Sequence, residues 1–243
     1  MDKKSGLIIG LLLVVLVIVA NLMFRDYVSV INKNSMYEIV EETMAEATTS
    51  ANTTNILLPA PKTDGGIPLM QALMKRKSSR SFSNKLLPEQ VLSDLLWAAA
   101  GYNRPDEKKR TVPSARNWQE IDVYVALGKG TYRYDPAENM LILVTKGDLR
   151  GLTGTQEFVA DAPLNLIYVA DISKMKGSTP ENRDLYMGID TGFISQNVYL
   201  FCASEGLATV VRGMLDREAL ASAMGLPEHK KVLFAQTVGY PSR

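Results

Sequence analysis

An almost unbroken apolar run near the amino terminus limits most strongly what this chain can form. Residues 6–24 read GLIIGLLLVVLVIVANLMF, and Asn21 is the one polar side chain among them. As a helix rising ~1.5 Å per residue, the run would reach ~28 Å, close to the hydrocarbon thickness of a bilayer. A helix in a soluble core usually keeps a polar face, which this run lacks. We therefore expect residues 6–24 to enter a membrane.

The flanks of the run allow two interpretations. In the first, the run is a retained transmembrane anchor, with the basic flank 1–5 before it and Arg25 and Asp26 at its far end. In the second, it is a signal peptide cleaved near Ala20, which would give a secreted protein. The lysines of the flank favour an amino terminus inside the cytoplasm. The anchor interpretation therefore predicts a membrane-anchored domain outside the cytoplasm, in the periplasm or on the outer face.

The rest of the chain divides into a spacer and one folded domain. Residues 25–65 form the expected spacer, because residues 47–54 read ATTSANTT and lack core-forming side chains. Prolines and glycines close this spacer. Apolar residues recur with helical and strand periods from there onward, so the folded domain is expected over residues 66–243.

The periodicity of this domain mixes helices and strands. Without strict alternation of strand and helix, the pattern favours an α+β fold with a largely antiparallel sheet flanked by helices. A near-continuous apolar strand at 164–170 is expected at the centre of the sheet. A long helix over 185–205, apolar nearly all round, is expected to end at Gly206. The remaining expected elements are helices at 68–77, 88–101 and 216–224, strands at 121–127, 207–211 and 232–238, and a hairpin over 132–145.

Cysteine and histidine each occur once, as Cys202 and His229. One cysteine excludes an internal disulfide framework and a cysteine-rich metal site. One histidine argues against a histidine-rich metal site and an ordinary Ser-His-Asp triad, so we expect no metal. A net charge of +1 gives no reason to expect nucleic acid as a partner. We interpret Cys202 as a packing residue and His229 as part of a solvated loop. Enzymatic chemistry, if present, would therefore come from a bound cofactor.

The most informative stretch is Arg76-Lys77-Ser78-Ser79-Arg80-Ser81-Phe82. In extended backbone, Arg76, Ser78 and Arg80 point to one side, so two guanidinium groups and a hydroxyl would face one ligand. Arginine forks suit phosphates and anionic ring edges. The alternative is a solvated cationic cluster that complements the dipole of the preceding helix.

A second stretch carries side-chain amides in a loop before a strand. Asn117 and Gln119 offer donors and acceptors that suit a heteroaromatic edge. The alternative is an ordinary loop, since Asn, Ser and Pro occur in loops anyway. The candidate ligand-binding residues here are Pro113, Ser114, Ala115, Asn117 and Gln119.

A third stretch lies where an expected strand ends. Val211 and Arg212 are followed by Gly213, and a glycine there lets a backbone N–H approach a flat ligand closely. The alternative is a plain turn between a strand and a helix.

Taken together and in this order, the stretches resemble the nitroreductase-like FMN-dependent oxidoreductase family, over roughly residues 67–243. The first stretch matches the family pattern R-x-S-x-R/K-x-F, and the second matches P-S-x-x-N-x-Q. Within the family, the chain is most similar to a compact branch that includes dehydrogenases of thiazole- and oxazole-modified peptides. Two further matches are D-x-G-x-x-x-Q-N at Asp190, Gly192, Gln196 and Asn197, and V-G-Y-P at Val238, Gly239, Tyr240 and Pro241.

The resemblance implies an α+β homodimer with two FMN molecules at the subunit interface. Arg76 and Ser78 would hold the phosphate and ribityl chain, and Arg80 would face the pyrimidine edge of the ring. The backbone of residues 211–213 would lie near the flavin N5 and O4 atoms. Contacts to the ring or ribityl chain, some of them from the second subunit, would come from Ser114, Ala115 and Asn117.

The resemblance also implies an activity: ping-pong electron transfer from NAD(P)H to a small organic acceptor such as a nitro compound or a quinone. A membrane donor such as a quinol is an alternative if the domain lies outside the cytoplasm. The sequence shows no amino-acid nucleophile or general base for such chemistry. Two other functions stay open: a non-catalytic flavin-binding or interaction module on a membrane tether, and an azoline-peptide dehydrogenase.

The chain departs from the family pattern at two arginines. Many family members supply a basic phosphate ligand from a tail after the V-G-Y-P strand. Here either Arg243 would take that role, or Arg76 would carry the phosphate with less help. Many relatives carry an uncharged or acidic residue at the position of Arg212. An additional cation there is expected to raise the flavin potential or to select an anionic substrate.

Overall fold

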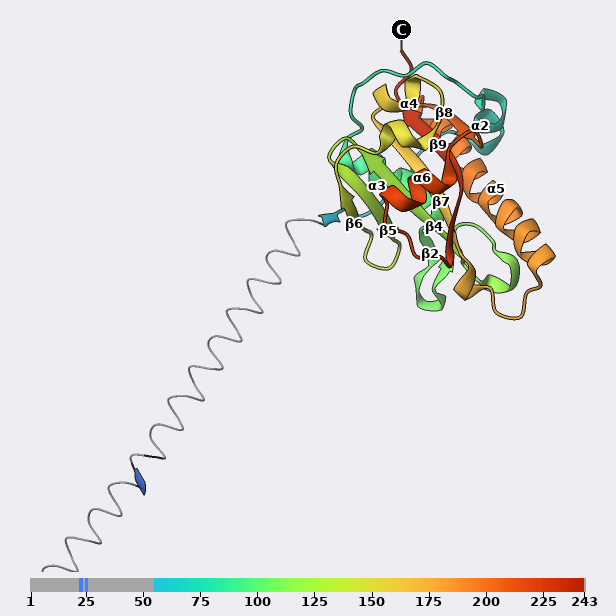
Figure 1. Cartoon of the computed structure of the whole chain (residues 1–243). Coiled ribbons are helices and arrows are strands. Elements are labelled where there is room, and N and C mark those ends of the chain that lie inside the picture. Colours follow the sequence, from blue (N-terminus) through green and yellow to red (C-terminus); the bar gives the residue numbers. More distant parts are fainter. Residues whose placement is uncertain (1–21, 24, 26–54, 243) are drawn as a thin grey trace, which may run out of the picture. The chain divides into compact units, whose positions relative to one another are not determined.

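The computed structural model of the chain describes residues 22–23, 25 and 55–242 (Figure 1). Most of the expected membrane segment 6–24, the spacer up to residue 54, and Arg243 lie outside the described residues. Leu22 and Met23 are helical. No helix within the described parts of the chain is both long and apolar enough to span a bilayer.

A seven-stranded sheet forms the centre of the folded domain (Figure 1). All neighbouring strands are antiparallel, so the predicted α+β class with an antiparallel sheet is confirmed. A small second sheet pairs β2 (Tyr102–Arg104) with β3 (Lys109–Arg110). The main sheet has the order β1-β6-β5-β4-β7-β9-β8, built from β1 (Ile56–Leu57), β4 (Ile121–Leu127), β5 (Gly130–Asp135), β6 (Met140–Lys146), β7 (Leu164–Asp171), β8 (Ala208–Arg212) and β9 (Lys230–Gly239).

Strand β7 is central, as its continuous apolar sequence predicted. It pairs with β4 on one side and β9 on the other, and all eight of its residues are buried. Apolar side chains occupy both of its faces because helices cover both faces of the sheet. Leu166 and Tyr168 pack in one apolar cluster, whereas Ile167 and Val169 pack in the cluster on the opposite face.

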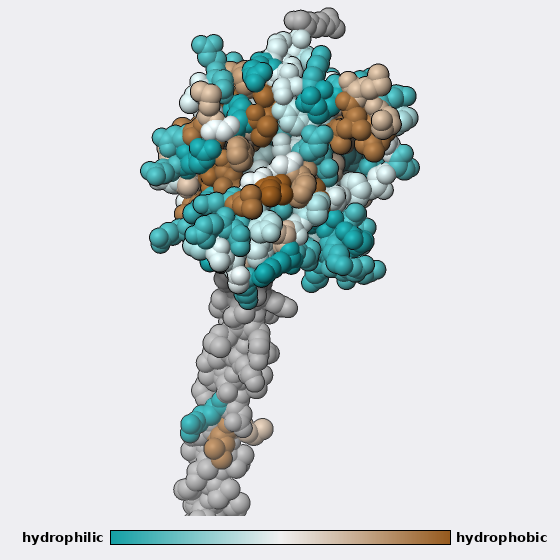
Figure 2. Space-filling view, turned by 90° about the vertical axis from the view of Figure 1, so that its right-hand side faces the viewer, coloured by the Kyte–Doolittle hydropathy of each residue, from teal (hydrophilic) through white to brown (hydrophobic). Residues whose placement is uncertain are grey.

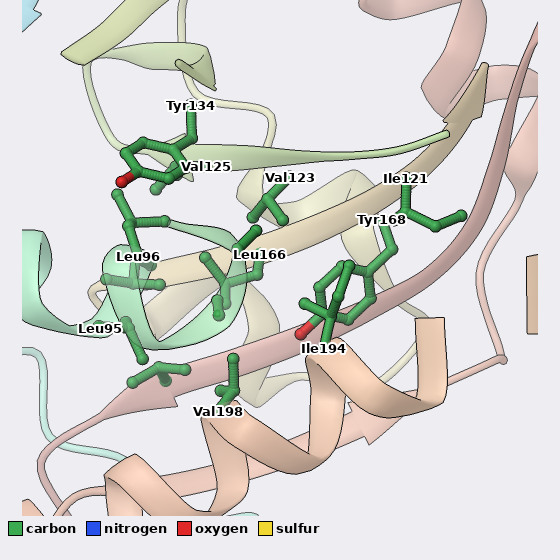
Figure 3. Close-up of a cluster of buried hydrophobic side chains, with 14 of the residues drawn as sticks. Leu95, Leu96, Ile121, Val123, Val125, Tyr134, Leu166, Tyr168, Ile194 and Val198 are labelled. Atoms are coloured by element: carbon green, nitrogen blue, oxygen red, sulfur yellow. The ribbon is translucent and has the colours of Figure 1, made fainter. Parts of the chain in front are cut away.

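Two long helices cover the first of these faces. They are α3 (Glu89–Ala100) and α5 (Pro180–Glu205), and their apolar residues interdigitate with those of β4 and β7 (Figure 3). Helix α5 begins five residues earlier than predicted, because Thr179 caps its first turn by accepting a hydrogen bond from Asn182 N–H. It ends as predicted at Gly206, which has a left-handed φ of 69°. The side chains in this layer are Leu95, Leu96, Val123, Val125, Leu166, Tyr168, Ile194 and Val198.

Shorter helices surround the rest of the sheet. On the opposite face, α6 (Arg217–Ala223) begins at the predicted cap, where the Asp216 carboxylate accepts from Ala219 N–H at 3.0 Å. Leu220 of α6 is fully buried in the second apolar cluster. The other helical elements are α2 (Leu69–Lys75), α4 (Phe158–Asp161) and the 3-10 turns η1 (Pro105–Glu107), η2 (Ala115–Asn117), η3 (Arg150–Thr153) and η4 (Ile172–Lys174).

The folded domain includes residues that the sequence assigned to the spacer. Strand β1 pairs with β6 at the far edge of the sheet, and the next residue, Leu58, is buried. Pro59 O accepts a hydrogen bond from Ser93 Oγ of α3. These contacts are long-range, so no local pattern marked residues 55–65 as part of the domain.

One side of α5 carries apolar side chains that nothing in the described residues covers. Leu185, Ile189 and Phe193 recur every four residues, and their exposed fractions are 56%, 41% and 41%. Figure 2 shows apolar patches among hydrophilic side chains on the side of the domain where α5 lies in Figure 1. The helix is therefore apolar on two sides, one packed against the sheet and one exposed.

Candidate functional site

The basic segment, defined as residues 76–82, follows α2 and runs along the outer edge of the sheet. Ser79 N–H donates to Thr209 O of β8 at 2.9 Å. Phe82 forms an antiparallel bridge with Pro241, just after β9. Because β8 is an edge strand, its outward backbone groups would otherwise lack partners. The fold thus places the basic segment beside β8, the strand that leads into residues 211–213.

The hydroxyl of Tyr199 on α5 joins these two parts of the site. It lies 2.9 Å from Ser78 Oγ and accepts a hydrogen bond from Val211 N–H at 3.1 Å. The Arg76 guanidinium lies over the Tyr199 ring, 5.4 Å from its centre. Arg76 and Ser78 therefore meet one side chain, in agreement with the prediction that they face the same way.

A pocket of about 450 Å³ opens beside this junction. Lys75, Lys77 and Ser79 line it together with residues of α5 and β8. Arg80 is exposed to solvent. No ion pair in the described part of the chain involves a cation of residues 75–80. These positive charges are therefore not neutralised by carboxylates of the domain.

The amide segment, defined as residues 113–119, lies elsewhere along the same helix. Ala115 N–H donates to Asp190 Oδ2 of α5 at 2.9 Å. Asp190 precedes Tyr199 by nine residues, which is ~13 Å of helix at 1.5 Å per residue. Within one chain, the basic segment and residues 211–213 thus come together at Tyr199. The amide segment contacts α5 about two and a half turns away from Tyr199.

The amide segment has an unusual backbone conformation. Arg116, Asn117 and Gln119 all adopt left-handed φ angles, between 50° and 55°. Such angles are strained for residues other than glycine and persist only where surrounding contacts impose them. Gln119 N–H donates to Ser114 Oγ at 3.0 Å, and Gln119 Nε2 donates to Lys108 O at 2.7 Å. Pro113, at the start of the segment, is exposed.

Arg212 differs from the sequence expectation. Its side chain is 5% exposed, and its guanidinium donates to Thr153 O at 3.1 Å, Asn165 Oδ1 at 2.9 Å and Thr237 Oγ1 at 2.8 Å. All three acceptors are neutral, and burial lowers the pKa of Arg212 to about 10. The expectation of a cation available to an anionic substrate is corrected: three acceptors hold this side chain inside the domain.

The strand-end segment, defined as residues 211–213, keeps its backbone at the sheet edge. Thr209 O and Val211 N–H both point outward, towards Ser79 and Tyr199. Antiparallel strands alternate in this way with a period of two residues, and β8 ends at Arg212, one residue before Gly213. The predicted glycine therefore follows directly on the outward-facing edge of β8, and its approach to a ligand stays a prediction.

Three buried residues at this site were not singled out as ligand-binding candidates from the sequence. They are Tyr199, Asp190 and Glu120, which follows the amide segment directly. A tyrosine on the buried face of a helix needs a partner for its hydroxyl, and this is the signal that would have pointed to Tyr199. The buried position of Glu120 depends on tertiary packing, which no local pattern shows.

The remaining residues with reactive side chains agree with their interpretation. Cys202 is fully buried, and burial raises the pKa of its thiol. His229 is exposed in the turn before β9. In the described residues, no cluster of three or more His, Cys, Asp or Glu side chains could hold a metal ion.

The chain is similar in sequence to known proteins. Residues 73–240 match the sequence profile of the Nitroreductase family. A Methanocaldococcus jannaschii protein assigned to the nitroreductases is 29% identical over 178 residues, which are 69% of this chain and 89% of that protein.

Solved structures are also similar. The crystal structure of a Ralstonia eutropha protein assigned to the nitroreductases is 45% identical, with a TM-score of 0.75 over 78% of this chain and 90% of that chain. The Escherichia coli microcin synthetase McbBCD complex contains a chain that is 20% identical, with a TM-score of 0.60 over 76% of this chain and 77% of that chain. At this identity, the second likeness shows a shared fold.

Proposed function

Because the chain belongs to the nitroreductase family, we propose that it is an FMN-dependent NAD(P)H oxidoreductase. Members of this family typically bind FMN and use NAD(P)H. The proposed acceptor is a small organic molecule such as a quinone or a nitro compound. A quinol from the membrane is the alternative donor that residues 6–24 suggest. The proposal assigns the basic, strand-end and amide segments to the cofactor.

The junction at Tyr199 is the observation that carries this proposal. It holds Arg76 and Ser78 beside the edge of β8, in a stretch whose cations have no carboxylate partners in the described residues. Guanidinium and hydroxyl donors of this kind fit the phosphate and ribityl hydroxyls of FMN. The donor set therefore suits the cofactor, and Arg243 is proposed as a further phosphate ligand.

The edge of β8 suits the ring of the cofactor. Gly213 has no side chain to separate its backbone from a flat ligand. Arg80 is exposed and supplies a positive charge for the ring edge. When bound, FMN supplies the electron transfer, in a ping-pong sequence from donor to acceptor. The protein binds and orients the cofactor, and its fixed charges act on the ring.

The flavin spectrum of the full-length protein tests the function. We expect the purified protein to show an oxidised-flavin absorption spectrum and to release FMN on denaturation. The spectrum should bleach with NADH or NADPH and recover with a quinone or a nitroarene. A flavin-containing protein that no donor reduces would instead indicate a non-catalytic binding module. A protein that stays colourless after incubation with FMN would contradict the proposal.

Alanine substitution at Arg80 should weaken FMN binding by about tenfold, because it removes a charged contact to the ring. It should also lower the midpoint potential, since the guanidinium stabilises negative charge on the reduced ring. Titration of apoprotein with FMN and spectroelectrochemistry measure both effects. Lys129→Ala is the control, as it removes an exposed cation in the turn between β4 and β5, away from the three segments. An Arg80→Ala variant that behaves like the control would exclude contact with the ring.

We also propose that the functional unit is a homodimer. Within one chain, the distance along α5 between Asp190 and Tyr199 separates the amide segment from the basic and strand-end segments. In a homodimer, the amide segment of one site would come from the second copy. The exposed stripe of Leu185, Ile189 and Phe193 offers an apolar surface for such a contact.

Replacing Phe193 with aspartate should weaken this dimer at least about tenfold, because a charge would be buried in an apolar contact. Sedimentation equilibrium of the detergent-solubilised protein measures the association. Lys176→Asp, which also introduces a negative charge on an exposed residue, is the control. A Phe193→Asp protein with unchanged association would place the subunit contact elsewhere.

The likeness to the microcin synthetase chain supports the shared fold, and azoline-peptide oxidation stays an alternative to the proposed activity.

A further inference from the structure

Two buried acids meet beneath the amide segment. Glu120 is fully buried, and Asp190 is 3% exposed. Neither carboxyl oxygen of Glu120 meets a hydrogen-bond donor from another residue in the described part of the chain. The carboxyl of Asp190 faces that of Glu120 and acts on it. Two carboxylates in contact and away from water cannot both be ionised, so this pair holds a proton.

The surroundings of Glu120 favour its neutral form. Burial, followed by the facing Asp190, raises the pKa of Glu120 to about 7. Arg110 from β3 and the backbone of Glu120 itself act in the opposite direction. Arg110 is engaged elsewhere, because its Nη1 donates to Ile121 O at 2.7 Å. Asp190 and Arg110 are the charged groups that act on Glu120 from the elements packed around it.

The same pair anchors the amide segment. Asp190 Oδ2 accepts the Ala115 N–H, so one carboxyl links Glu120 to the segment's backbone. Three residues of the segment have left-handed φ angles, and such a conformation relaxes when its anchors are lost. If Glu120 ionises, its carboxylate repels the Asp190 carboxyl. This repulsion displaces the Asp190 carboxyl and weakens its bond to the Ala115 N–H.

We propose that Glu120 is a positioning residue whose protonated carboxyl holds Asp190, and through it the amide segment, in the conformation that binds FMN. The part concerning FMN rests on the proposed function. The part concerning the carboxyl pair applies to the apoprotein as well, so the two can be tested separately.

The direction of the pH dependence follows from proton binding. Between the ordinary carboxyl pKa of 4.5 and about 7, the native state keeps a proton that the unfolded chain has released. The stability contributed by the pair is complete below pH 4.5 and is lost as the pH rises towards 7. Glutamine cannot ionise, but its amide can still donate to Asp190. Glu120→Gln should therefore remove this loss.

The experiment is urea denaturation of full-length apoprotein between pH 5 and pH 8.5. For each pH, the unfolding equilibrium constant of Glu120→Gln is divided by that of wild type. We expect this ratio to fall by about tenfold or more from pH 5 to pH 8. Glu138→Gln, an exposed glutamate in the turn between β5 and β6, should follow the wild-type profile. Parallel profiles for wild type and Glu120→Gln would overturn the proposal. If Glu120→Gln does not fold, Asp190→Asn is the second variant: its amide can donate to an ionised Glu120, so the loss of stability between pH 5 and pH 8 should shrink, although Glu120 stays buried.

Two local measurements separate positioning from general stability. Hydrogen exchange in residues 113–119, corrected for its intrinsic pH dependence, should accelerate from pH 6 to pH 8.5 in wild type but not in Glu120→Gln. The Kd for FMN should rise over the same range in wild type relative to the variant. Unchanged exchange in this segment would contradict a positioning role. If wild type binds no FMN at any pH, the proposed function fails, while the apoprotein profiles still decide whether the pair exists.

Discussion

Replacing Gly154 with alanine should destabilise the folded domain by about 3 kcal/mol, the upper end of the usual cost of overpacking a core. A Cβ at this position would overlap Nη1 of Arg212 and come within 3.2 Å of a Val159 methyl group. The backbone itself could accept alanine, because the φ of Gly154 is 176°, an extended value. The cost therefore arises from the clash with a guanidinium that three hydrogen bonds hold in place.

Urea denaturation measures this effect, and a double-mutant cycle identifies its cause. Arg212→Ala alone should also destabilise, since it leaves the buried acceptors Thr153 O and Thr237 Oγ1 without a donor, while Asn165 Oδ1 keeps the Thr237 hydroxyl. Gly154→Ala should cost much less in the Arg212→Ala background, because the clash is gone. Gly151→Ala is the control, as its Cβ would meet only the Ala160 methyl, at 3.9 Å. Additive effects of the two substitutions would show that Arg212 is free to move.

Removing the Tyr199 hydroxyl should have the second large effect. Tyr199→Phe leaves Val211 N–H without its acceptor and frees Ser78 from α5. An unsatisfied backbone donor costs about 1–3 kcal/mol, and both segments at the proposed flavin site lose their common anchor. We expect FMN affinity to fall by about 30-fold, or ~2 kcal/mol. Thermal unfolding of the apoprotein should show the cost of the unpaired Val211 N–H alone, about 1–3 kcal/mol.

Fluorescence titration of apoprotein with FMN measures the loss. Tyr186→Phe removes a hydroxyl from the same helix far from Val211 and should bind FMN like wild type. Ser78→Ala should reproduce part of the Tyr199→Phe effect, because Tyr199 then keeps its bond to Val211. An unchanged affinity in Tyr199→Phe would mean that the two segments are positioned independently.

The sequence predicted those parts of the fold whose pattern is local. Strand β4 has the predicted bounds 121–127, and the buried centre of β7 follows from its apolar run. The start of α5 was placed late because its first turn is polar and lies in solvent. The short strand β1 was missed, since two residues carry no period and their pairing with β6 is a long-range contact.

The site shows the same division between local and long-range information. An extended segment alternates its side chains, so the sequence predicted Arg76 and Ser78 on the same side of the segment. The burial of Arg212 could not be predicted, because its acceptors Thr153, Asn165 and Thr237 are neutral and distant in sequence. A buried arginine with only neutral partners has no signature in the sequence. The side chain of Arg212 is buried because the fold brings together four elements, β8 and the three that carry its acceptors.

The basic segment's pairing with the sheet edge also fixes when the site can form during synthesis. Ser79 is bonded to Thr209, and Ser83 N–H to Tyr240 O, across 130 and 157 positions of the chain. Strands β4 and β5, by contrast, are joined by a short turn and can pair early. Closing long loops is the slow part of assembling such a topology. A nascent chain that has emerged only as far as α5 has no β8 against which the cationic segment can lie. If this segment binds FMN as proposed, capture of the cofactor is a late event, which follows the emergence of the last strand.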